Sequence, residues 1–414
     1  MDTGTFGGWM GRVFDRWPKW PVWARALSIL ALVSAGVLVL GGIGWFQYLQ
    51  EMFNRLPAVA QGIVLSVLVV VALVVLGFSI HQGMQKSDLN AESERLKKEL
   101  ALATERWDRL QLVETQSSLW WNPCQIAVPP FVPAVQRRTR FVCMLNLKGG
   151  VGKTTLTANL AAGLGLTGGC RVLLVDLDFQ GTLGEVAADP AFKKDRLDRE
   201  DLVHQFLRLP QFDETVFRRL QVPVFDVPQA KVVMANDRLD TDDFQQQARF
   251  FVNPQADPRY RFRTHLHRTE VFDQFDVVLF DCPPRVTTSV VNALFCSDYI
   301  LIPTTLDAGS IEAVPRMLLW IKRFGALCPA SGVGVIPMRV GLHRGQVVSA
   351  EKNNYVLLRK ESSRVYNSDV VWDNFVPDSS AAVSQARGRI ASLKPAGRKV
   401  FERVVEEFRK RVLS

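Results

Sequence analysis

A glycine-rich loop at residues 148–155, KGGVGKTT, constrains the fold of this 414-residue chain more than any other feature. The loop follows the largely apolar run 141–147 and precedes the largely apolar run 156–166, so a strand is expected before it and a helix after it. Glycine lets backbone N–H groups approach a phosphate closely, and the positive end of the following helix points at the same place. The sequence therefore predicts a phosphate-binding loop between a strand and a helix.

The loop departs from ordinary P-loop spacing at its amino end. Gly152, Lys153 and Thr154 match the tail of the pattern Gly-x-x-x-x-Gly-Lys-Thr, but Leu147 stands where the first glycine would be, and Lys148 follows it. This is the deviant form of the Walker A motif. We expect Lys153 to neutralise β- and γ-phosphate oxygens and the Thr154 hydroxyl to bind Mg²⁺. The residues predicted to bind the nucleotide are Gly149, Gly150, Val151, Gly152, Lys153, Thr154 and Thr155.

Two further apolar runs end in carboxylates. Run 171–175 precedes Asp176 and Asp178, and run 277–280 precedes Asp281. In a doubly wound parallel sheet the carboxyl ends of the strands converge on the crevice where phosphates bind. Each aspartate taken alone would also suit a helix cap or a turn. The three together predict an α/β fold of the P-loop NTPase type, with a doubly wound, mostly parallel sheet. The predicted metal ligands are Thr154, Asp281 and Asp176.

From about residue 140 to its end, the chain resembles the ParA/MinD family of deviant-Walker P-loop ATPases. The resemblance is carried by KGGVGKTT at 148–155, VLLVDLDFQG at 172–181, VVLFDCPP at 277–284, SDYILIP at 297–303 and VWDNFVPDSSAA at 371–382. One departure is Phe179, which stands where the family usually has proline.

The resemblance implies ATP and Mg²⁺ as cofactors and a role for each matching residue. Lys148 matches the signature lysine, which in the family reaches across an ATP-sandwiched dimer to the partner's phosphates, so hydrolysis would depend on self-association. Asp178 matches the residue linked to the attacking water, and Asp281 the residue near Mg²⁺. Asp176 would only support the metal shell. The predicted catalytic residues are Lys148, Lys153 and Asp178.

The amino-terminal part of the chain holds two long uncharged runs, 26–46 and 57–80. Each is long enough for the ~20 residues that cross a bilayer as a helix. A buried core helix or a cleaved signal peptide is the alternative. We predict a transmembrane α-hairpin within residues 1–84, in contact with membrane lipid. The positive-inside rule then predicts a multi-pass protein of the bacterial cytoplasmic (inner) membrane, with both termini and the ATPase domain in the cytoplasm.

Three further segments complete the predicted organisation. Residues 85–118 carry apolar residues at three- and four-residue steps, which suits either a coiled coil or a single amphipathic helix packed on its own domain. Prolines mark residues 119–139 as a linker. The ATPase domain spans residues 140–414, and within it the charged stretch 184–268 predicts an insertion or a partner surface, with a helix over 197–220.

Net charge and cysteine pattern bear on which partners and metals the chain could bind. The formal net charge is +9, and much of it falls in the tail at 387–411. Such a run is usually a solvated helix face, although it would also attract DNA or anionic lipid. We do not favour nucleic acid as a partner. Six cysteines without a C-x-x-C pair indicate a reducing compartment and no metal cluster.

These observations predict a membrane-anchored ATPase that works as an ATP-dependent dimerisation switch. It would position or regulate a partner or cargo and hydrolyse ATP slowly without that partner. Three alternatives remain open: a tyrosine kinase of the polysaccharide-export type, a nucleotide-held scaffold, and a membrane effector or defence switch. The sequence identifies neither the partner nor the cargo.

Overall fold

A computed structural model describes residues 53–54, 61–62, 64–67, 69, 94–101, 120–121, 124, 126–344, 346–378 and 390–414. The chain divides into two compact units, Met1–Gln111 and Leu112–Ser414. In the first unit, the predicted helix over 85–118 is described only at residues 94–101, and these are helical. The rest of that prediction, like most of the predicted hairpin, lies outside the described residues.

The predicted location in the inner membrane is wrong on what the structure describes. Within the described ranges, no helix is both long enough and apolar enough to cross a bilayer. The longest helix with described bounds, α16 (Ser349–Tyr366), has 18 residues and carries charged side chains along its length. The transmembrane hairpin, and membrane lipid as a partner through two spans, therefore have no support here. The two predicted spans, 26–46 and 57–80, lie outside the described residues except for 61–62, 64–67 and 69.

The second unit is built on an eight-stranded sheet with the strand order β10-β7-β6-β1-β5-β2-β4-β3. Neighbouring strands run parallel, except that β3 is antiparallel to β4. The strands are β1 (Arg140–Met144), β2 (Val172–Asp176), β3 (Gln221–Val224), β4 (Val227–Val233), β5 (Val277–Asp281), β6 (Tyr299–Thr304), β7 (Gly332–Val340) and β10 (Val376–Pro377). A separate hairpin pairs β8 (Leu342–His343) with β9 (Gln346–Val347). The predicted mostly parallel α/β sheet is confirmed.

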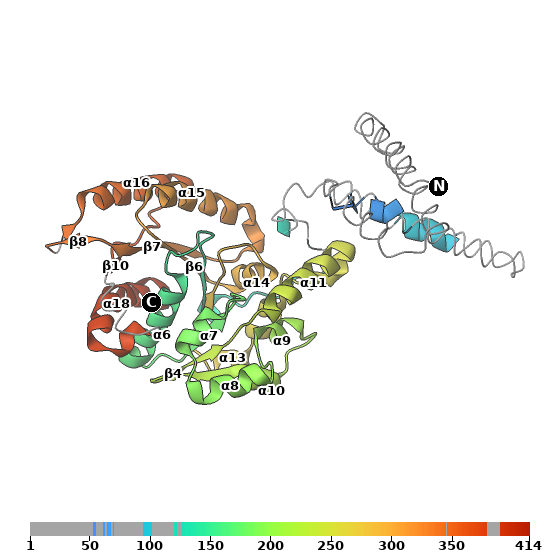
Figure 1. Ribbon diagram of the computed structural model, residues 1–414, viewed down its shortest axis with the longest axis horizontal. Coiled ribbons are helices and arrows are strands. Elements are labelled where there is room, and N and C mark those ends of the chain that lie inside the picture. Colours follow the sequence, from blue (N-terminus) through green and yellow to red (C-terminus); the bar gives the residue numbers. More distant parts are fainter. Residues whose placement is uncertain are drawn as a thin grey trace, which may run out of the picture. The chain divides into compact units, whose positions relative to one another are not determined.

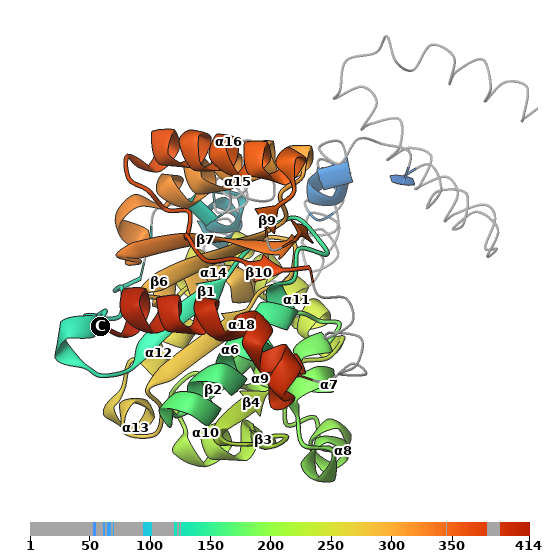
Figure 2. The ribbon, with the colours of Figure 1, turned by 90° about the vertical axis from the view of Figure 1, so that its left-hand side faces the viewer.

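Helices cover both faces of this sheet. Figures 1 and 2 show α6 and α18 on one face, with α12 and α14 on the other. The helices are α6 (Lys153–Gly168), α7 (Thr182–Ala187), α8 (Pro190–Asp198), α9 (Val203–Arg208), α10 (Glu214–Leu220), α11 (Arg238–Val252), α12 (Arg261–Leu266), α13 (Thr269–Phe272), α14 (Thr288–Cys296), α15 (Ala308–Arg323), α16 and α18 (Pro395–Phe408). A π-helical turn, Arg409–Leu413, follows α18.

Side-chain alternation along β1 explains the two cores. Phe141, Cys143 and Leu145 point into the core on one face, and Val142 and Met144 into the core on the other. All five are fully buried. A parallel strand covered by helices on both faces needs such a continuous apolar run. This is why the apolar residues before the glycine-rich loop form a central strand.

The stretch 184–268 contributes to the sheet itself. It supplies β3 and β4, joined at Asp226, whose φ of 55° is left-handed. The helix predicted over 197–220 is wrong, because α9 and α10 are separate helices there. Pro210 follows α9, and Asp213 caps α10 by accepting a hydrogen bond from the Val216 N–H at 3.1 Å. Proline disfavours helical backbone in the residue before it, and an N-cap aspartate begins a new helix.

The basic tail forms an amphipathic helix. In α18, the side chains of Phe401, Val404 and Phe408 are buried, whereas Lys399 and Arg403 are exposed. The helix packs on α6 in Figure 2. Much of the positive charge of the tail is thus presented on a solvated helix face.

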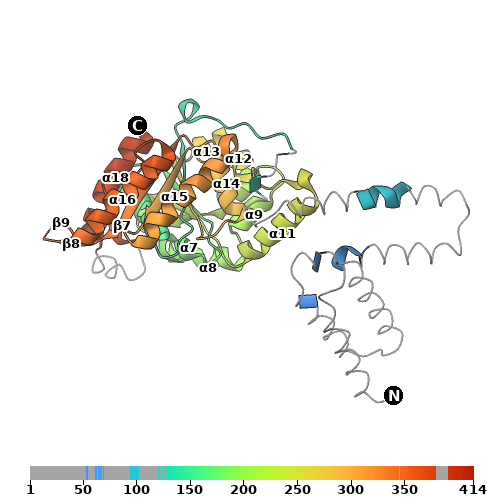
Figure 3. The ribbon, with the colours of Figure 1, turned by 90° about the horizontal axis from the view of Figure 1, so that it is seen from above.

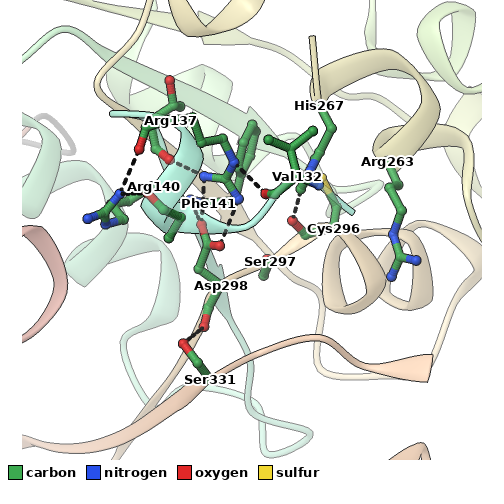
Figure 4. A network of polar contacts seen from close by, with 12 residues as sticks. Val132, Arg137, Arg140, Phe141, Arg263, His267, Cys296, Ser297, Asp298 and Ser331 are labelled. Atoms are coloured by element: carbon green, nitrogen blue, oxygen red, sulfur yellow. Dashed lines mark hydrogen bonds and ion pairs between the residues drawn. The ribbon is translucent and has the colours of Figure 1, made fainter. Parts of the chain in front are cut away.

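At the amino-terminal edge of the sheet, where the parallel strands begin, the side chain of Arg137 is buried. Figure 4 shows its polar contacts. Its guanidinium donates to both oxygens of Asp298, at 2.7 and 3.0 Å, and to the Val132 carbonyl at 2.9 Å. It also lies 4.7 Å from the ring centroid of Phe141. Asp298 accepts the Phe141 N–H as well, at 2.8 Å. A buried ion pair therefore connects the segment before β1 to the loop before β6.

His267 fastens the same segment from the other side (Figure 4). The Val132 N–H donates to Nδ1 at 3.1 Å, so the ring proton lies on Nε2, which donates to the Cys296 carbonyl at 2.9 Å. Burial lowers the pKa of His267 to about 3, with a further contribution from the nearby Arg137 charge. The ring is neutral at pH 7, and both its nitrogens are paired.

Candidate functional site

The glycine-rich loop leads from β1 to the amino end of α6. Gly152, the residue before the helix, has a φ of 90°, and a Cβ placed there would lie 3.1 Å from Cε of Met338. The left-handed backbone favours glycine at this position, and a larger residue would also have to displace the end of the Met338 side chain. The loop residues Gly149 and Gly150 are exposed just before the helix. Exposed backbone beside a helix amino terminus is the arrangement that binds phosphate.

Lys153, the first residue of α6, is buried beneath the loop. Its ammonium donates to the Lys148 carbonyl at 3.2 Å. Burial lowers the pKa of Lys153, and the charges of Asp281 and Asp178 oppose that shift. The structure thus brings this predicted phosphate-binding lysine within electrostatic range of two of the three predicted carboxylates, Asp281 and Asp178. Of the other predicted nucleotide contacts, Val151 is buried in the loop, and Thr154 and Thr155 lie in the first turn of α6.

Asp281 is the last residue of β5 and is buried. Its Oδ1 accepts a hydrogen bond from the Thr157 hydroxyl at 3.2 Å. Its Oδ2 has no hydrogen-bond partner among the residues that the structure describes. Burial raises the pKa of Asp281 to about 6, while the Thr154 hydroxyl and the Lys153 ammonium act in the opposite direction. A buried carboxylate oxygen without a partner is costly, and a bound cation would satisfy it.

Asp176 ends β2 directly beside Asp281 in the sheet register. Its Oδ1 accepts the Asp178 N–H at 3.1 Å, and its Oδ2 accepts the Gly184 N–H at 3.0 Å. Burial raises the pKa of Asp176 well above its usual range, and the neighbouring Asp281 adds to the effect. Both oxygens therefore hold the backbone of the following loop. The role of Asp176 as a metal ligand stays a prediction.

Residues 178–184, which we name the switch loop, carry Asp178 at their start. The Asp178 carboxylate accepts the Gln180 N–H at 3.0 Å, and its carbonyl accepts the Gly181 N–H at 2.8 Å. These bonds close a tight turn. Asp178 is only partly buried, so its carboxylate is accessible beside the loop that holds Lys153. That position suits the predicted contact with an attacking water.

The side chain of Lys148 contacts residues of its own chain. Its ammonium donates to both oxygens of Asp307 at 2.7 Å and to the Ser310 hydroxyl at 3.1 Å. Asp307 is the N-cap of α15 and accepts the Ser310 N–H at 3.1 Å. Although burial raises it, hydrogen bonds from Lys148 and Thr305 hold the pKa of Asp307 well below its usual range. The signature lysine is thus paired within one chain.

Three functional neighbours were not predicted from the sequence. Asn146 accepts the Lys148 N–H at 2.9 Å and donates to the Pro303 carbonyl at 2.8 Å, which fixes the start of the loop. Thr157 contacts Asp281, and Asp307 holds Lys148. Only Asp307 had a sequence signal, because aspartate is one of the residues preferred at a helix N-cap.

Residues 139–328 match the profile of a family described as an AAA domain. An uncharacterised protein of Mycobacterium tuberculosis is 34% identical over 42% of this chain and 49% of its own length. The chromosome partitioning protein ParA of Caulobacter vibrioides is 28% identical over 46% of this chain and 65% of its own length. The chain thus spans less than two thirds of either curated relative.

Among solved structures, the chain is similar to cobyrinic acid a,c-diamide synthase from Mycobacterium smegmatis, solved with a bound ATP analogue and magnesium. The TM-score is 0.51 at 22% identity, covering 66% of this chain and 96% of the other. This likeness shows that the chain shares the fold of that protein. The matched profile covers residues 139–328, the part of the chain that carries the glycine-rich loop, and the ParA relative is similar to less than half of this chain.

Proposed function

We propose that this chain binds ATP with Mg²⁺ at the loop 148–155 and hydrolyses it. The observation that carries the proposal is Asp281, whose buried Oδ2 lacks a hydrogen-bond partner among the described residues, beside the Thr154 hydroxyl and the amino end of α6. Thr154 and Asp281 would hold Mg²⁺, which supplies charge neutralisation for the phosphates. The neighbour structure with a bound ATP analogue and magnesium supports this choice of ligand, since its fold is shared.

The chain's own residues would divide the work as follows. Backbone N–H groups of residues 149–154 bind phosphate oxygens, and Lys153 neutralises them from beneath the loop. Asp178 orients the attacking water from the switch loop. Asp176 keeps that loop in place through its two backbone hydrogen bonds. Positioning and electrostatic stabilisation supply most of the catalysis of phosphoryl transfer. Residues that bind, neutralise and position the reacting groups are therefore the kind that this reaction needs.

Self-association would complete the site through Lys148. In the single chain this lysine is paired with Asp307, and both side chains are partly exposed. ATP binding would favour a dimer in which Lys148 leaves Asp307 and contacts the partner's phosphates. Such a charge supplied in trans acts as an arginine finger does. Hydrolysis would then open the dimer.

Cycling between these states would let the chain position or regulate a partner or cargo. The relationship to a chromosome partitioning protein supports a role of this kind. Because the lysine that completes the site is held away from it by Asp307, we expect slow turnover in the absence of a partner.

The test is the oligomeric state of the full-length chain, measured by light scattering with ATP, with ADP and without nucleotide. We expect a dimer with ATP alone. Lys153→Ala should remove the dimer because phosphate binding is lost, and Lys148→Ala should remove it because the contact in trans is lost. Exposed Lys399, far along the chain on α18, provides a matched control as Lys399→Ala.

Two outcomes would count against the proposal. An assembly that forms equally with ATP, ADP and no nucleotide would exclude the switch. ATP-dependent association that survives in both lysine variants would exclude the assigned residues.

A further inference from the structure

Phe179, the second residue of the switch loop, is held from outside the loop. Its side chain is partly buried against the core, and the guanidinium carbon of Arg285 lies 4.7 Å from its ring centroid. A guanidinium over an aromatic face is an attractive contact. The side chain next to Asp178 is therefore covered by a residue from the loop that follows β5.

Arg285 also reaches the first turn of α11. Its guanidinium donates to the carboxylate of Asp240. Arg285 itself stands four residues after Asp281 in the chain. One side chain thus connects three segments: the switch loop, the loop that begins at the predicted metal ligand, and α11.

The corner between β4 and α11, residues 234–240, contacts the switch loop at two more points. A Cβ on Gly181, whose φ is 64°, would lie 2.7 Å from the Ala235 carbonyl oxygen. A Cβ on Gly184 would lie 3.0 Å from Cγ of Met234. Close approach and left-handed backbone both demand glycine at 181. The switch loop therefore rests directly on this corner.

The helix that provides Asp240 is itself fixed by buried carboxylates. Asp243 accepts the Thr288 N–H at the amino end of α14, at 2.5 Å. Asp242 is paired with Arg208 of α9. Figure 3 shows α11 with α9 and α14, on the side of the domain away from α18. The helix that follows the corner is thus bonded to both α9 and α14.

We propose that Arg285 is a positioning residue for hydrolysis: with Asp240 it holds Phe179 against the β4–α11 corner and so fixes Asp178. The proposal rests on the proposed function. Proline restricts its own φ to about −65°, whereas phenylalanine leaves the backbone free. At position 179 the chain has phenylalanine where the resemblance leads one to expect proline. The contact with Arg285 replaces the restriction that proline would impose.

The competing interpretation is an ordinary surface ion pair. The side chains of Arg285 and Asp240 are 44% and 50% exposed, and such pairs contribute little to stability. The two interpretations differ in what they predict for catalysis. A surface pair affects neither turnover nor the requirement for a particular residue at 179.

The test measures kcat and KM for ATP in the full-length chain. Arg285→Ala should lower kcat about two- to fivefold, the factor expected from loss of one exposed cation–π contact. The KM for ATP should stay the same, because the glycine-rich loop is untouched. Asp240→Asn, which leaves Arg285 over Phe179 but weakens its anchor, should lower kcat less. Arg218→Ala is the matched control, since Arg218 and Glu214 form a similarly exposed pair, 57% and 44%, on α10.

A second variant chain, Phe179→Pro, separates a positioning role of Arg285 from a purely structural one. In a Phe179→Pro chain the backbone is restricted without Arg285, so Arg285→Ala should cause no further fall in kcat. An equal fall in both backgrounds would overturn the proposal, as would an Arg285→Ala chain that matches Arg218→Ala. If the unaltered chain shows no hydrolysis that Lys153→Ala removes, the proposed function fails and this inference fails with it. If that hydrolysis is present and Arg285→Ala leaves kcat unchanged, only this inference fails.

Discussion

Buried charged groups are paired at the amino-terminal edge of the parallel sheet, whereas one at the carboxyl-terminal edge is left partly unpaired among the described residues. At the amino-terminal edge, Arg137 and Asp298 pair with each other, and His267 uses both ring nitrogens (Figure 4). At the carboxyl-terminal edge, Asp281 keeps one oxygen without a partner among the described residues. Paired groups contribute to a defined structure, whereas an unpaired one is costly unless something binds it. The comparison separates the residues that maintain the fold from those that serve the site.

The largest expected effect is at the amino-terminal edge. Arg137→Ala leaves the Asp298 carboxylate buried without its cation, which should lower the free energy of unfolding by about 3–5 kcal/mol. Urea denaturation measures the change. Arg138→Ala, at the exposed neighbouring position, serves as the control. A loss at Arg137 no greater than at Arg138 would mean that this edge does not maintain the fold.

The same kind of substitution should have the opposite consequence at the other edge. Asp281→Asn should reduce ATP hydrolysis by about 10²–10³-fold, as removal of one key electrostatic group does. Its free energy of unfolding should stay equal or rise, because a buried carboxylate of raised pKa is replaced by a neutral amide. Asp298→Asn should instead destabilise the chain. Equal stability losses in the two variants would remove the contrast between the edges.

A substitution at Asp176 shows whether this residue stabilises the fold or binds the metal. Asp176→Ala removes the acceptor of the Asp178 and Gly184 N–H groups and should lower the free energy of unfolding by about 1–3 kcal/mol. Thermal denaturation, with limited proteolysis of the switch loop, measures it. A variant of unchanged stability that needs far more Mg²⁺ for hydrolysis would instead favour Asp176 as a metal ligand.

His267 gives the amino-terminal edge a pH dependence. The unfolded chain protonates this histidine near pH 6.5, whereas the folded chain does so only near its pKa of about 3. Between these values the unfolded state binds more protons, so stability is complete above pH 6.5 and falls as the pH decreases. The contribution should be about 1.4 kcal/mol per pH unit. Comparing urea denaturation of the unaltered chain and His267→Gln from pH 7 to 5 isolates it, and parallel curves would contradict it.

The smallest expected effect concerns Lys148. Asp307→Asn removes the charge that holds the lysine but keeps an N-cap residue for α15. Because the pair is partly exposed, its loss should lower the ATP concentration for half-maximal association by no more than about fivefold. Light scattering during an ATP titration measures this shift. Weaker association of the variant would mean that Asp307 assists the dimer rather than restrains it.

The central strand, the loop and α6 could be predicted because local signals agree there. Phe141 to Leu145 are apolar on both faces, and Gly152 and Lys153 follow at P-loop spacing. Strands β3 and β4 were missed because Pro223 and Pro228 interrupt their pattern, and proline is rare in strands. Their pairing is decided by contacts distant in the chain.

Site neighbours from distant segments could not be predicted in the same way. Lys148 and Asp307 are 159 residues apart in the sequence, and only the placement of β1 beside β6 brings them together. Arg285 likewise contacts Phe179 because the loops that carry them follow the neighbouring strands β5 and β2. The predicted inner-membrane location is contradicted because no helix among the described residues could cross a bilayer, while the runs 26–46 and 57–80 lie mostly outside those residues.

The most direct test of the central claim is phosphate release from ATP by the full-length chain, with and without Mg²⁺, alongside Lys153→Ala. We predict release that requires Mg²⁺ and is lost in the variant, because the carboxyl-terminal edge would then be where the nucleotide is bound and cleaved. Release at the same rate in both chains, or release in neither, would contradict the assignment of this edge as an ATPase site.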